Sequence, residues 1–478
     1  MKEKKESNSK DSKVPLKPNL LISAIPILVL MISLSVTIIV YEGSPHIPLL
    51  ISACVAGIIS LILGNKWNDI EAGIINTIQM SMQAILILMI IGILVGTWIL
   101  CGTVPTMIYY GLKILSPSIF LLATCIICCI VSLATGSSWT TAGTIGIALM
   151  GVGAGLGIPA PQIAGAIISG AYFGDKMSPL SDTTNLAPAM AGTTLFEHIK
   201  HMIYTVTPSL VIALIVFGIL GLKYVGKPLD TSLLNDIFAG LEASGSLNPI
   251  LLLPPVLVIF LVVKKMPAIP GLLLGVVAGA ILAIVVQGVN FGDIVTVLND
   301  GYTSSTGVAV VDDLLSGGGL QGMMFTVSLI ISAMIFGGVM EQSGMLNALA
   351  ESLLRFAKGT GSLVFVTILS CFLVNLLAAD QYLSIVIPGR MYKNEFAKRG
   401  LHPKNLSRCL EDCGTLTSAF IPWNTCGAYM STTLGVSPLA YAPYCILNYI
   451  NPIISIIYGF TGFTMEKLES DIESAVEL

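Results

Sequence analysis

Charged side chains are scarce in this sequence. Asp, Glu, Lys and Arg make up only 10% of its 478 residues, whereas a soluble domain usually carries about 25%. Aromatic residues reach only 7%, and the formal net charge is −4. So few charges cannot cover the surface of a water-soluble chain of this length. No basic block is interleaved with aromatic residues, which argues against a nucleic-acid partner.

Known catalytic and metal-binding patterns are missing as well. The sequence contains no His-Glu-x-x-His, no Gly-x-Ser-x-Gly and no phosphate-binding loop. Its ten cysteines lack the paired spacing of a zinc site. Most of them stand inside apolar stretches, where cysteine packs as a small hydrophobic residue. We therefore expect no cofactor.

Long apolar runs are abundant instead. Hydrophobic residues make up 54% of the chain, and the mean hydropathy is +0.88. A helix needs about 20 apolar residues to cross roughly 30 Å of hydrocarbon. The runs that approach or reach this length are residues 20–41, 81–101, 118–134, 202–222, 268–287 and 361–379. The sequence therefore predicts an all-α polytopic membrane protein, whose first partner is the lipid bilayer.

Glycine and proline recur at a constant spacing. The pairs Gly157/Gly400, Pro179/Pro422 and Gly192/Gly435 are each 243 residues apart (400 − 157, 422 − 179, 435 − 192). Basic residues, which gather in cytoplasmic loops, also occupy opposite loops in the two halves. We therefore expect two inverted-topology repeats with broken or re-entrant helices, roughly 12 to 14 membrane segments in all, and both termini in the cytoplasm.

These features divide the chain into five parts. The expected parts are a cytoplasmic N-terminal tail (1–19), a first transmembrane repeat (20–222), an external linker (223–246), a second, inverted repeat (247–460) and a cytoplasmic acidic tail (461–478).

A dense polar run interrupts the apolar pattern at residues 174–185. A charge near the bilayer centre costs at least ~2.5 to 3.5 kcal/mol, so charged residues there are usually functional. A proline break frees backbone carbonyls beside polar side chains, and small cations prefer such oxygen ligands. Our candidates for a cation and proton site are Asp182, Asp380, Thr183, Asn185, Ser181, Asn424 and Thr425.

Two further sets of polar residues accompany this run. The candidates for gating or for a secondary proton site are Asp175, Lys176, Asp412 and Glu411, with a structural role as the alternative. The candidates for lining a substrate path are Thr135, Ser137, Ser138, Gln381 and Trp423. If Na⁺ and H⁺ compete for one carboxylate that is reached from one side at a time, they exchange across the membrane. The pattern favours a secondary transporter that works by alternating access.

Residues 170–188 closely resemble the signature of the NhaC family of bacterial Na⁺/H⁺ antiporters, and residues 138–144, 379–384 and 421–427 resemble further features of it. The resemblance implies a multi-pass carrier of the bacterial plasma membrane. It also implies membership of the broad ion-transporter superfamily, whose inverted repeats carry Ser-Asn-Thr cation sites. Asp182 departs from that pattern, because it places an acid where the superfamily often has an amide. This departure favours a site that also accepts a proton.

Organic anions remain an alternative substrate. The same family includes carriers similar to malate/lactate exchangers, and helix N-termini and hydroxyls would supply the donors that such an anion needs. No arginine is clearly placed at mid-membrane to hold a second carboxylate, so exchange of Na⁺ for H⁺ is favoured. A homodimer is compatible with the sequence.

Two interpretations outside exchange are weaker. An intramembrane protease would use Gly174-Asp175 in an aspartyl pair, or Ser137 or Ser138 as a nucleophile, but no intramembrane histidine is expected to activate a serine. A channel would not need carboxylates in broken segments of an internally repeated chain.

Overall fold

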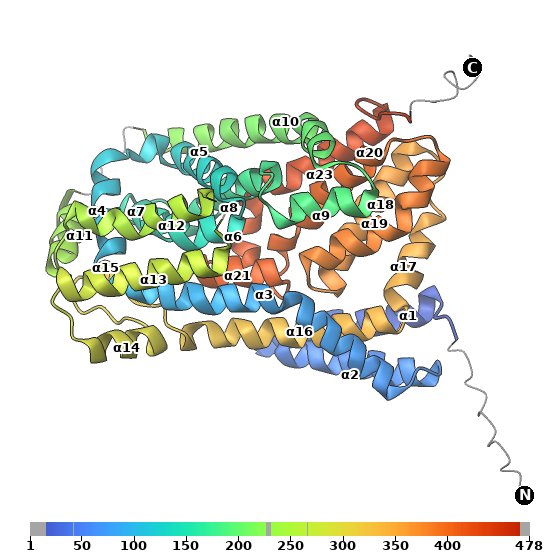
Figure 1. Ribbon diagram of the computed structural model, residues 1–478, viewed down its shortest axis with the longest axis horizontal. Coiled ribbons are helices and arrows are strands. Elements are labelled where there is room, and N and C mark those ends of the chain that lie inside the picture. The colour runs from blue at the N-terminus through green and yellow to red at the C-terminus, as the bar shows by residue number, and fades with distance from the viewer. Residues whose placement is uncertain (1–15, 42, 226–230, 265, 469–478) are drawn as a thin grey trace, which may run out of the picture.

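The computed structural model describes residues 16–41, 43–225, 231–264 and 266–468. In this part of the chain all regular structure is helical, apart from two isolated bridges, Tyr302–Gly317 and Leu401–Lys467. Most helices run along the long axis of an elongated molecule (Figure 1). The expected all-α class is confirmed.

The helices of the first half are α1 (Leu20–Ser35), α2 (His46–Ile62), α3 (Trp67–Leu100), α4 (Thr103–Ile114), α5 (Pro117–Thr135), α6 (Ser138–Thr141), α7 (Ile147–Gly155), α8 (Ala160–Met177), α9 (Asp182–Ala191) and α10 (Leu195–Leu222). Those that follow are α11 (Thr231–Ala243), α12 (Leu253–Val263), α13 (Ala268–Val285), α14 (Phe291–Asp300), α15 (Ala309–Leu314), α16 (Met324–Gln342), α17 (Met345–Leu354), α18 (Thr360–Leu377), α19 (Gln381–Lys398), α20 (Pro403–Leu410), α21 (Thr425–Leu434), α22 (Pro438–Tyr441) and α23 (Ile446–Thr461). Wider π-helical turns occupy Val36–Val40, Ala142–Gly146 and Glu411–Thr415.

Six of the described helices are long and apolar enough to cross a membrane. They are α3, α5, α10, α13, α18 and the Gln321–Gln342 helix that contains α16. The pair Pro438–Tyr444 and Ile446–Thr461, bent by 63°, adds a seventh if it forms one broken span. The helices α1 and α2 are shorter apolar segments. These helices confirm a polytopic membrane protein, whereas the number and orientation of its spans stay predictions.

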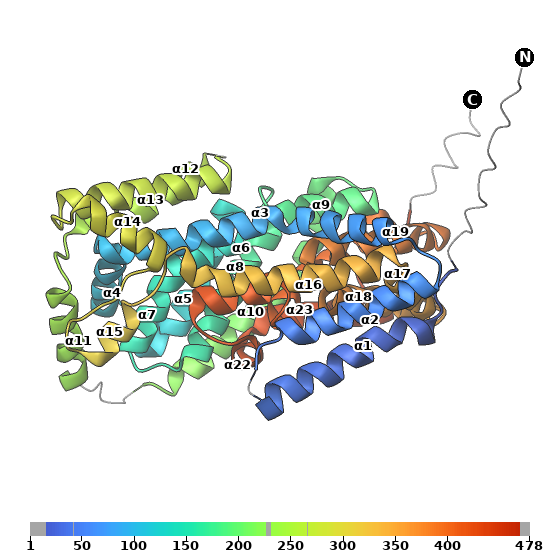
Figure 2. The same ribbon diagram turned by 90° about the horizontal axis from the view of Figure 1, so that it is seen from below.

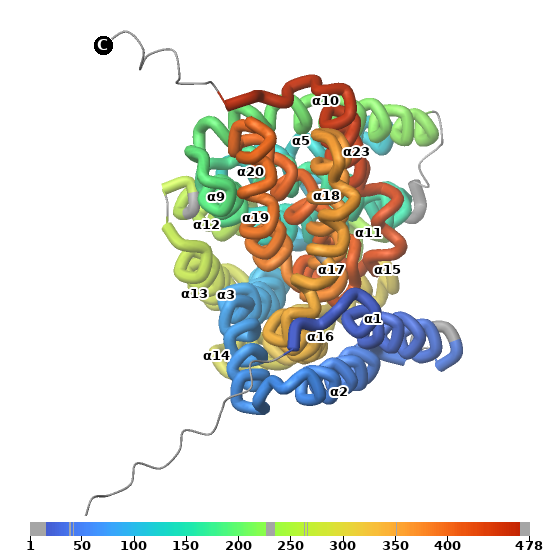
Figure 3. The backbone as a smooth tube through the Cα atoms, turned by 90° about the vertical axis from the view of Figure 1, so that its right-hand side faces the viewer, coloured from blue at the N-terminus to red at the C-terminus, as the bar shows by residue number. Residues whose placement is uncertain are grey.

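The helices pack in two groups. The first group contains α1, α2, α3, α13, α14, α16 and α17, and the second contains α5, α8, α9, α10, α18, α19, α20 and α23. In Figure 3 the first group lies mainly in the lower part of the view and the second in the upper part. In the first group α3 packs along α16 and α13, and in the second α5 packs along α8 and α10. Buried apolar side chains fill both groups and the boundary between them.

Helix boundaries recur at the spacing found in the sequence. The starts of α6, α8 and α9 are matched by those of α19, α20 and α21, each 243 residues later (381 − 138, 403 − 160, 425 − 182). The backbone recurs too, because Gly136 and Ala379 both have positive φ, 69° and 57°. In addition, the hairpins α1–α2 and α12–α13 lie toward opposite ends of the long axis (Figure 2). Three helix starts and one backbone turn of the first half therefore recur at a constant spacing in the second.

Candidate functional site

A cavity of about 270 Å³ lies where the two helix groups meet. On the side of the first group, α3 and the connection before α13 form its wall, with Gln83, Ala84, Ile87, Met266, Pro267 and Ala268. On the side of the second group, the wall comes from helix breaks, with Thr135, Gly136, Ser137, Trp139, Thr140, Asp175, Leu180, Ser181, Asp182, Thr183, Gln381, Tyr382 and Thr425. Eight of the sixteen predicted site residues therefore line one cavity, whereas the other eight, Ser138 among them, do not.

Four helices begin at this cavity, namely α6, α9, α19 and α21. Each start is fixed by a side chain that accepts a hydrogen bond from a free amide of the first turn. The four bonds run from Thr140 N to Ser137 (3.1 Å), from Thr184 N to Ser181 (3.5 Å), from Tyr382 N to Asp380 (2.8 Å) and from Cys426 N to Asn424 (3.0 Å). A helix N-terminus carries about half a positive charge. Four of them together favour negative groups here, from the protein or from a ligand.

The breaks have local causes in the sequence. Pro179 follows the end of α8 and lacks the amide that a continuing helix would need. Gly136 joins α5 to α6 with φ 69°, and a Cβ atom there would lie 2.7 Å from the Cβ of Leu180. Only glycine fits this position, because both the backbone conformation and the close approach exclude a side chain. The contact therefore fixes the α5–α6 break against the α8–α9 break.

Asp182 has the properties of an ion ligand. It lines the cavity in the first turn of α9 and is solvent-exposed, although its neighbours Ser181 and Thr183 are buried. Among the described residues, no hydrogen bond or ion pair occupies its carboxylate. The carboxylate is therefore available to a cation or a proton that enters the cavity.

Asp175 combines a structural contact with a place in the cavity wall. Its Oδ2 accepts hydrogen bonds from the Ser138 amide (3.1 Å) and the Ser138 hydroxyl (2.6 Å). These bonds tie the end of α8 to the start of α6. Asp175 also lines the cavity, so its carboxyl group faces any ion bound there.

Asp380 lies behind the wall rather than on it. Its side chain is 1% exposed, while Gln381, Tyr382 and Thr425 face the cavity. One carboxylate oxygen caps α19, and the other accepts a hydrogen bond from Ser81 on α3 (3.0 Å). Ser81 is a functional candidate that sequence reasoning missed, because one serine within an apolar run carries no signal of its own.

Several other predicted residues are turned away from the cavity. Asn185 donates to the carbonyls of Pro179 (3.0 Å) and Ser181 (2.7 Å), and Asn424 donates to the Asn375 side chain (3.1 Å). Trp423 donates its indole N–H to the Leu376 carbonyl (2.8 Å). Asn185, Asn424 and Trp423 hold the helix breaks in place.

Lys176, Asp412 and Glu411 form a buried charged cluster behind the cavity. Lys176 Nζ lies 2.5 Å from Asp412 Oδ1, and both side chains are fully buried. Arg408 adds a second cation, with its Nε 4.0 Å from Asp412 Oδ2. Glu411 accepts a hydrogen bond from the hydroxyl of Thr183 (2.9 Å), which lines the cavity. The cluster thus reaches the cavity through one threonine.

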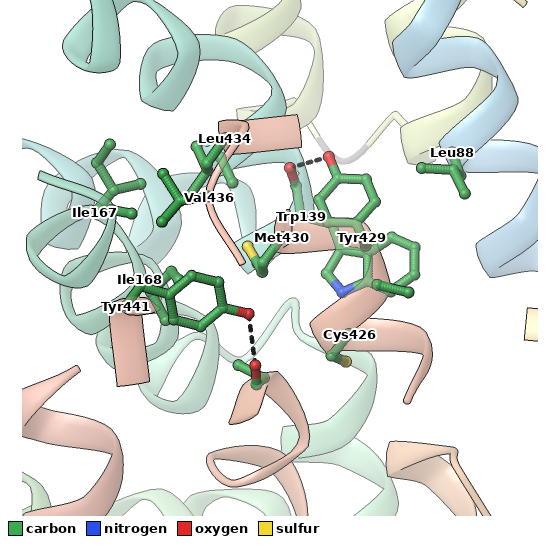
Figure 4. Packing of buried hydrophobic residues seen from close by; sticks show 14 of the residues in the cluster. Leu88, Trp139, Ile167, Ile168, Cys426, Tyr429, Met430, Leu434, Val436 and Tyr441 are labelled. Atoms are coloured by element: carbon green, nitrogen blue, oxygen red, sulfur yellow. Dashed lines mark hydrogen bonds between the residues drawn. The ribbon is translucent and has the colours of Figure 1, made fainter. Parts of the chain in front are cut away.

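An aromatic pair supports the wall from within. The ring of Trp139 stacks on Tyr429 with centroids 4.1 Å apart, and the Tyr429 hydroxyl donates to the Trp139 carbonyl (2.7 Å) (Figure 4). Below this pair in the view, Tyr441 donates to a carbonyl, that of Ala419 (2.6 Å). The stack joins α6 to α21, so it links helices that begin at breaks in the two halves. Trp139 lies in the motif at residues 138–144, whereas no pattern in the sequence marks Tyr429.

The chain is similar in sequence to known transport proteins over most of its length. A family model described as the Na⁺/H⁺ antiporter family matches residues 170–463. The Na⁺/H⁺ antiporter NhaC of Alkalihalophilus pseudofirmus is 41% identical over 446 residues, which cover 92% of this chain and 96% of that protein. The malate-2H⁺/Na⁺-lactate antiporter of Bacillus subtilis is 39% identical over 417 residues, with 87% and 89% covered. The arginine/ornithine antiporter ArcD of Halobacterium salinarum is 38% identical over 457 residues, with 94% of each chain covered.

Proposed function

Because this chain belongs to the Na⁺/H⁺ antiporter family, we propose that it exchanges Na⁺ for H⁺ across the bacterial plasma membrane. The family consists of transporters, so the chain is not an enzyme. The observation that carries the proposal is the exposed carboxylate of Asp182, to which no group of the described residues is bonded, in a cavity between two helix groups. Na⁺ and H⁺ compete for this carboxylate, so that each displaces the other.

The remaining oxygens of the site come from neighbouring breaks. Ser181, Thr183 and Thr425 line the same cavity, and their hydroxyl and backbone oxygens suit a small, hard cation. Asp380 acts from behind Thr425, whose side chain also interacts with the Asp380 carboxylate. Asp175 adds negative charge at the wall. In this proposal Asn185 and Asn424 shape the site without contacting the ion.

Alternating access follows from the arrangement of the two groups. Both groups line the cavity, so a change in their packing opens it to one side and closes it to the other. The shared helix boundaries and the opposed hairpins support inverted repeats at residues 20–222 and 247–460, joined by an external linker at 223–246. Inversion of the repeats, with the basic residues toward the cytoplasm, would place both termini there.

A second candidate function is Na⁺- and H⁺-coupled exchange of an organic anion such as malate or lactate. The cavity of about 270 Å³ has far more room than an unhydrated Na⁺ needs. Four helix N-termini converge on it, which favours a carboxylate ligand. The similar protein from Bacillus subtilis is named for malate and lactate.

Membrane vesicles test the exchange and its site. Na⁺ addition is expected to collapse a preset pH gradient in vesicles that contain the protein, and Asp182→Ala is expected to abolish the effect. Asp69→Ala is the matched control, since Asp69 is exposed in the first turn of α3 but does not line the cavity. Full exchange by Asp182→Ala would refute the site. Exchange that requires malate or lactate on opposite sides would favour the second candidate.

A further inference from the structure

The contact between Ser81 and Asp380 joins the two helix groups. Ser81 lies on α3 in the first group, and Asp380 lies at the break between α18 and α19 in the second. The Ser81 hydroxyl donates to Asp380 Oδ2 at 3.0 Å, and both side chains are buried. The hydroxyls of Thr326 on α16 and Thr432 on α21 also bond to each other, between the first group and a helix outside both groups, but that pair is neutral. The Ser81 bond therefore differs because it holds a buried carboxylate.

The matching position in the first half indicates that capping the start of α19 does not by itself require a carboxylate. Asp380 corresponds to Ser137 in the first half (380 − 137 gives the same spacing of 243), and Ser137 caps α6 with a hydroxyl. Asp380 caps α19 through Oδ1, which accepts from the Tyr382 and Leu383 amides at 2.8 and 3.1 Å. A buried carboxylate is costly unless all its oxygens are bonded. Its second oxygen, Oδ2, is therefore the part that a serine could not replace.

The residues around the α18–α19 break make the Ser81–Asp380 hydrogen bond specific to one packing of the two helix groups. Glycine at position 337 on α16 lets that helix approach closely, because a Cβ there would lie 2.8 Å from the Ala378 carbonyl oxygen. The same face of the first group carries Met334, whose sulfur lies 3.0 Å from the Ser81 hydroxyl. If α3 shifts against the α18–α19 break by more than a fraction of an ångström, the hydrogen bond to Asp380 is lost.

We propose that Ser81 is a positioning residue for transport, which ties α3 to Asp380 in the conformation seen here and releases it when the cavity changes sides. The inference rests on the proposed function only in treating this cavity as the transport cavity. Ser81 acts through the carboxylate of Asp380 and need not touch the ion. Because a hydrogen bond to a charged group is stronger than a neutral one, its loss should change the ratio of the two conformations by about tenfold.

Cysteine labelling tests this proposal without any transport measurement. Leu180 lines the cavity and is 37% exposed, so Leu180→Cys reports access to the cavity. Cys54 is the exposed one of the ten cysteines and is replaced by Ala as background. In purified protein in lipid nanodiscs, we expect Ser81→Ala to lower the rate at which a water-soluble maleimide labels Cys at 180. Ser52→Ala is the control, since this buried α2 hydroxyl bonds only to a backbone carbonyl, and its rate should equal that of the parent.

Asp380→Ser completes a double-mutant cycle with Ser81→Ala. This variant keeps a capping hydroxyl, as at Ser137, but lacks the second oxygen that receives the Ser81 bond. It should lower the labelling rate as Ser81→Ala does, and Ser81→Ala should then have no further effect in the Asp380→Ser background. Unchanged labelling in Ser81→Ala, or full additivity of the two substitutions, would overturn the proposal. A wild-type protein that labels as expected but fails to exchange Na⁺ for H⁺ would refute the proposed function alone.

Discussion

The buried ion pair between Lys176 and Asp412 should dominate the stability of the second helix group. Both side chains are fully buried, and Asp412 Oδ1 also accepts a hydrogen bond from Thr205 at 3.0 Å. Removing one partner of a buried pair typically costs about 3 to 5 kcal/mol, because the other charge remains without compensation. We expect Asp412→Asn to lower the free energy of unfolding by this amount.

The two single substitutions should not be equal. Asp412→Asn leaves two buried cations, Lys176 and Arg408, without their shared carboxylate. Lys176→Met leaves Arg408 facing Asp412 at 4.0 Å, so part of the compensation remains and the loss should be smaller. The double variant should lie closer to the wild type than Asp412→Asn does, because one of the two cations that lost their shared carboxylate is gone.

Equilibrium unfolding in mixed micelles with a rising fraction of a denaturing detergent measures these differences. The control is Lys398→Met, which removes an ion pair of 2.7 Å whose lysine side chain is 70% exposed. Such a surface pair should contribute less than about 1 kcal/mol. If Asp412→Asn unfolds at the same detergent fraction as Lys398→Met, the buried pair has no special role and the reasoning fails.

Three further results are expected. Asp182→Asn should leave the unfolding free energy within about 0.5 kcal/mol of the wild type, since this exposed side chain has no partner in the part of the chain that the structure describes, and a larger loss by the same unfolding assay would show a structural role. Gly136→Ala should destabilise the protein more than Gly157→Ala, because both have positive φ but only a Cβ at 136 meets other atoms, and equal thermal shifts would contradict this. Asp312 lies on α15, and a hydrogen bond from the Thr306 amide holds the pKa of its carboxyl below the ordinary value of 3.8. Hydrogen exchange of that amide should therefore stay protected down to pH 4 and lose protection only in more acidic solution, whereas loss of protection already at pH 5 would contradict the assignment.

The apolar runs and the breaks were predictable because their causes are local. Hydropathy over about 20 residues marks a span, and Pro179 and Gly136 end helices through their own backbone limits. The positions of Asp175 and Asp182 in the cavity followed from the density of polar residues in one short run.

Contacts across the two halves were not predictable in the same way. Lys176 and Asp412 are 236 residues apart, and they meet only in the assembled fold, where the end of α8 comes near the turn at Glu411–Thr415. Ser81 resembles many other hydroxyls in apolar helices until the structure places it on Asp380. Asn424 was expected at the ion, but its amide serves the cap of α21 and the Asn375 side chain instead. The direction in which such a side chain points depends on the assembled fold.

The most direct test of the central claim is Na⁺-driven proton movement in proteoliposomes of the purified protein, compared between the wild type and Asp182→Asn. The account predicts that an outward Na⁺ gradient alone acidifies the lumen in the wild type, without malate or lactate, and leaves it unchanged in the variant. Equal proton movement in both proteins would show that the exchange does not use the carboxylate at the start of α9.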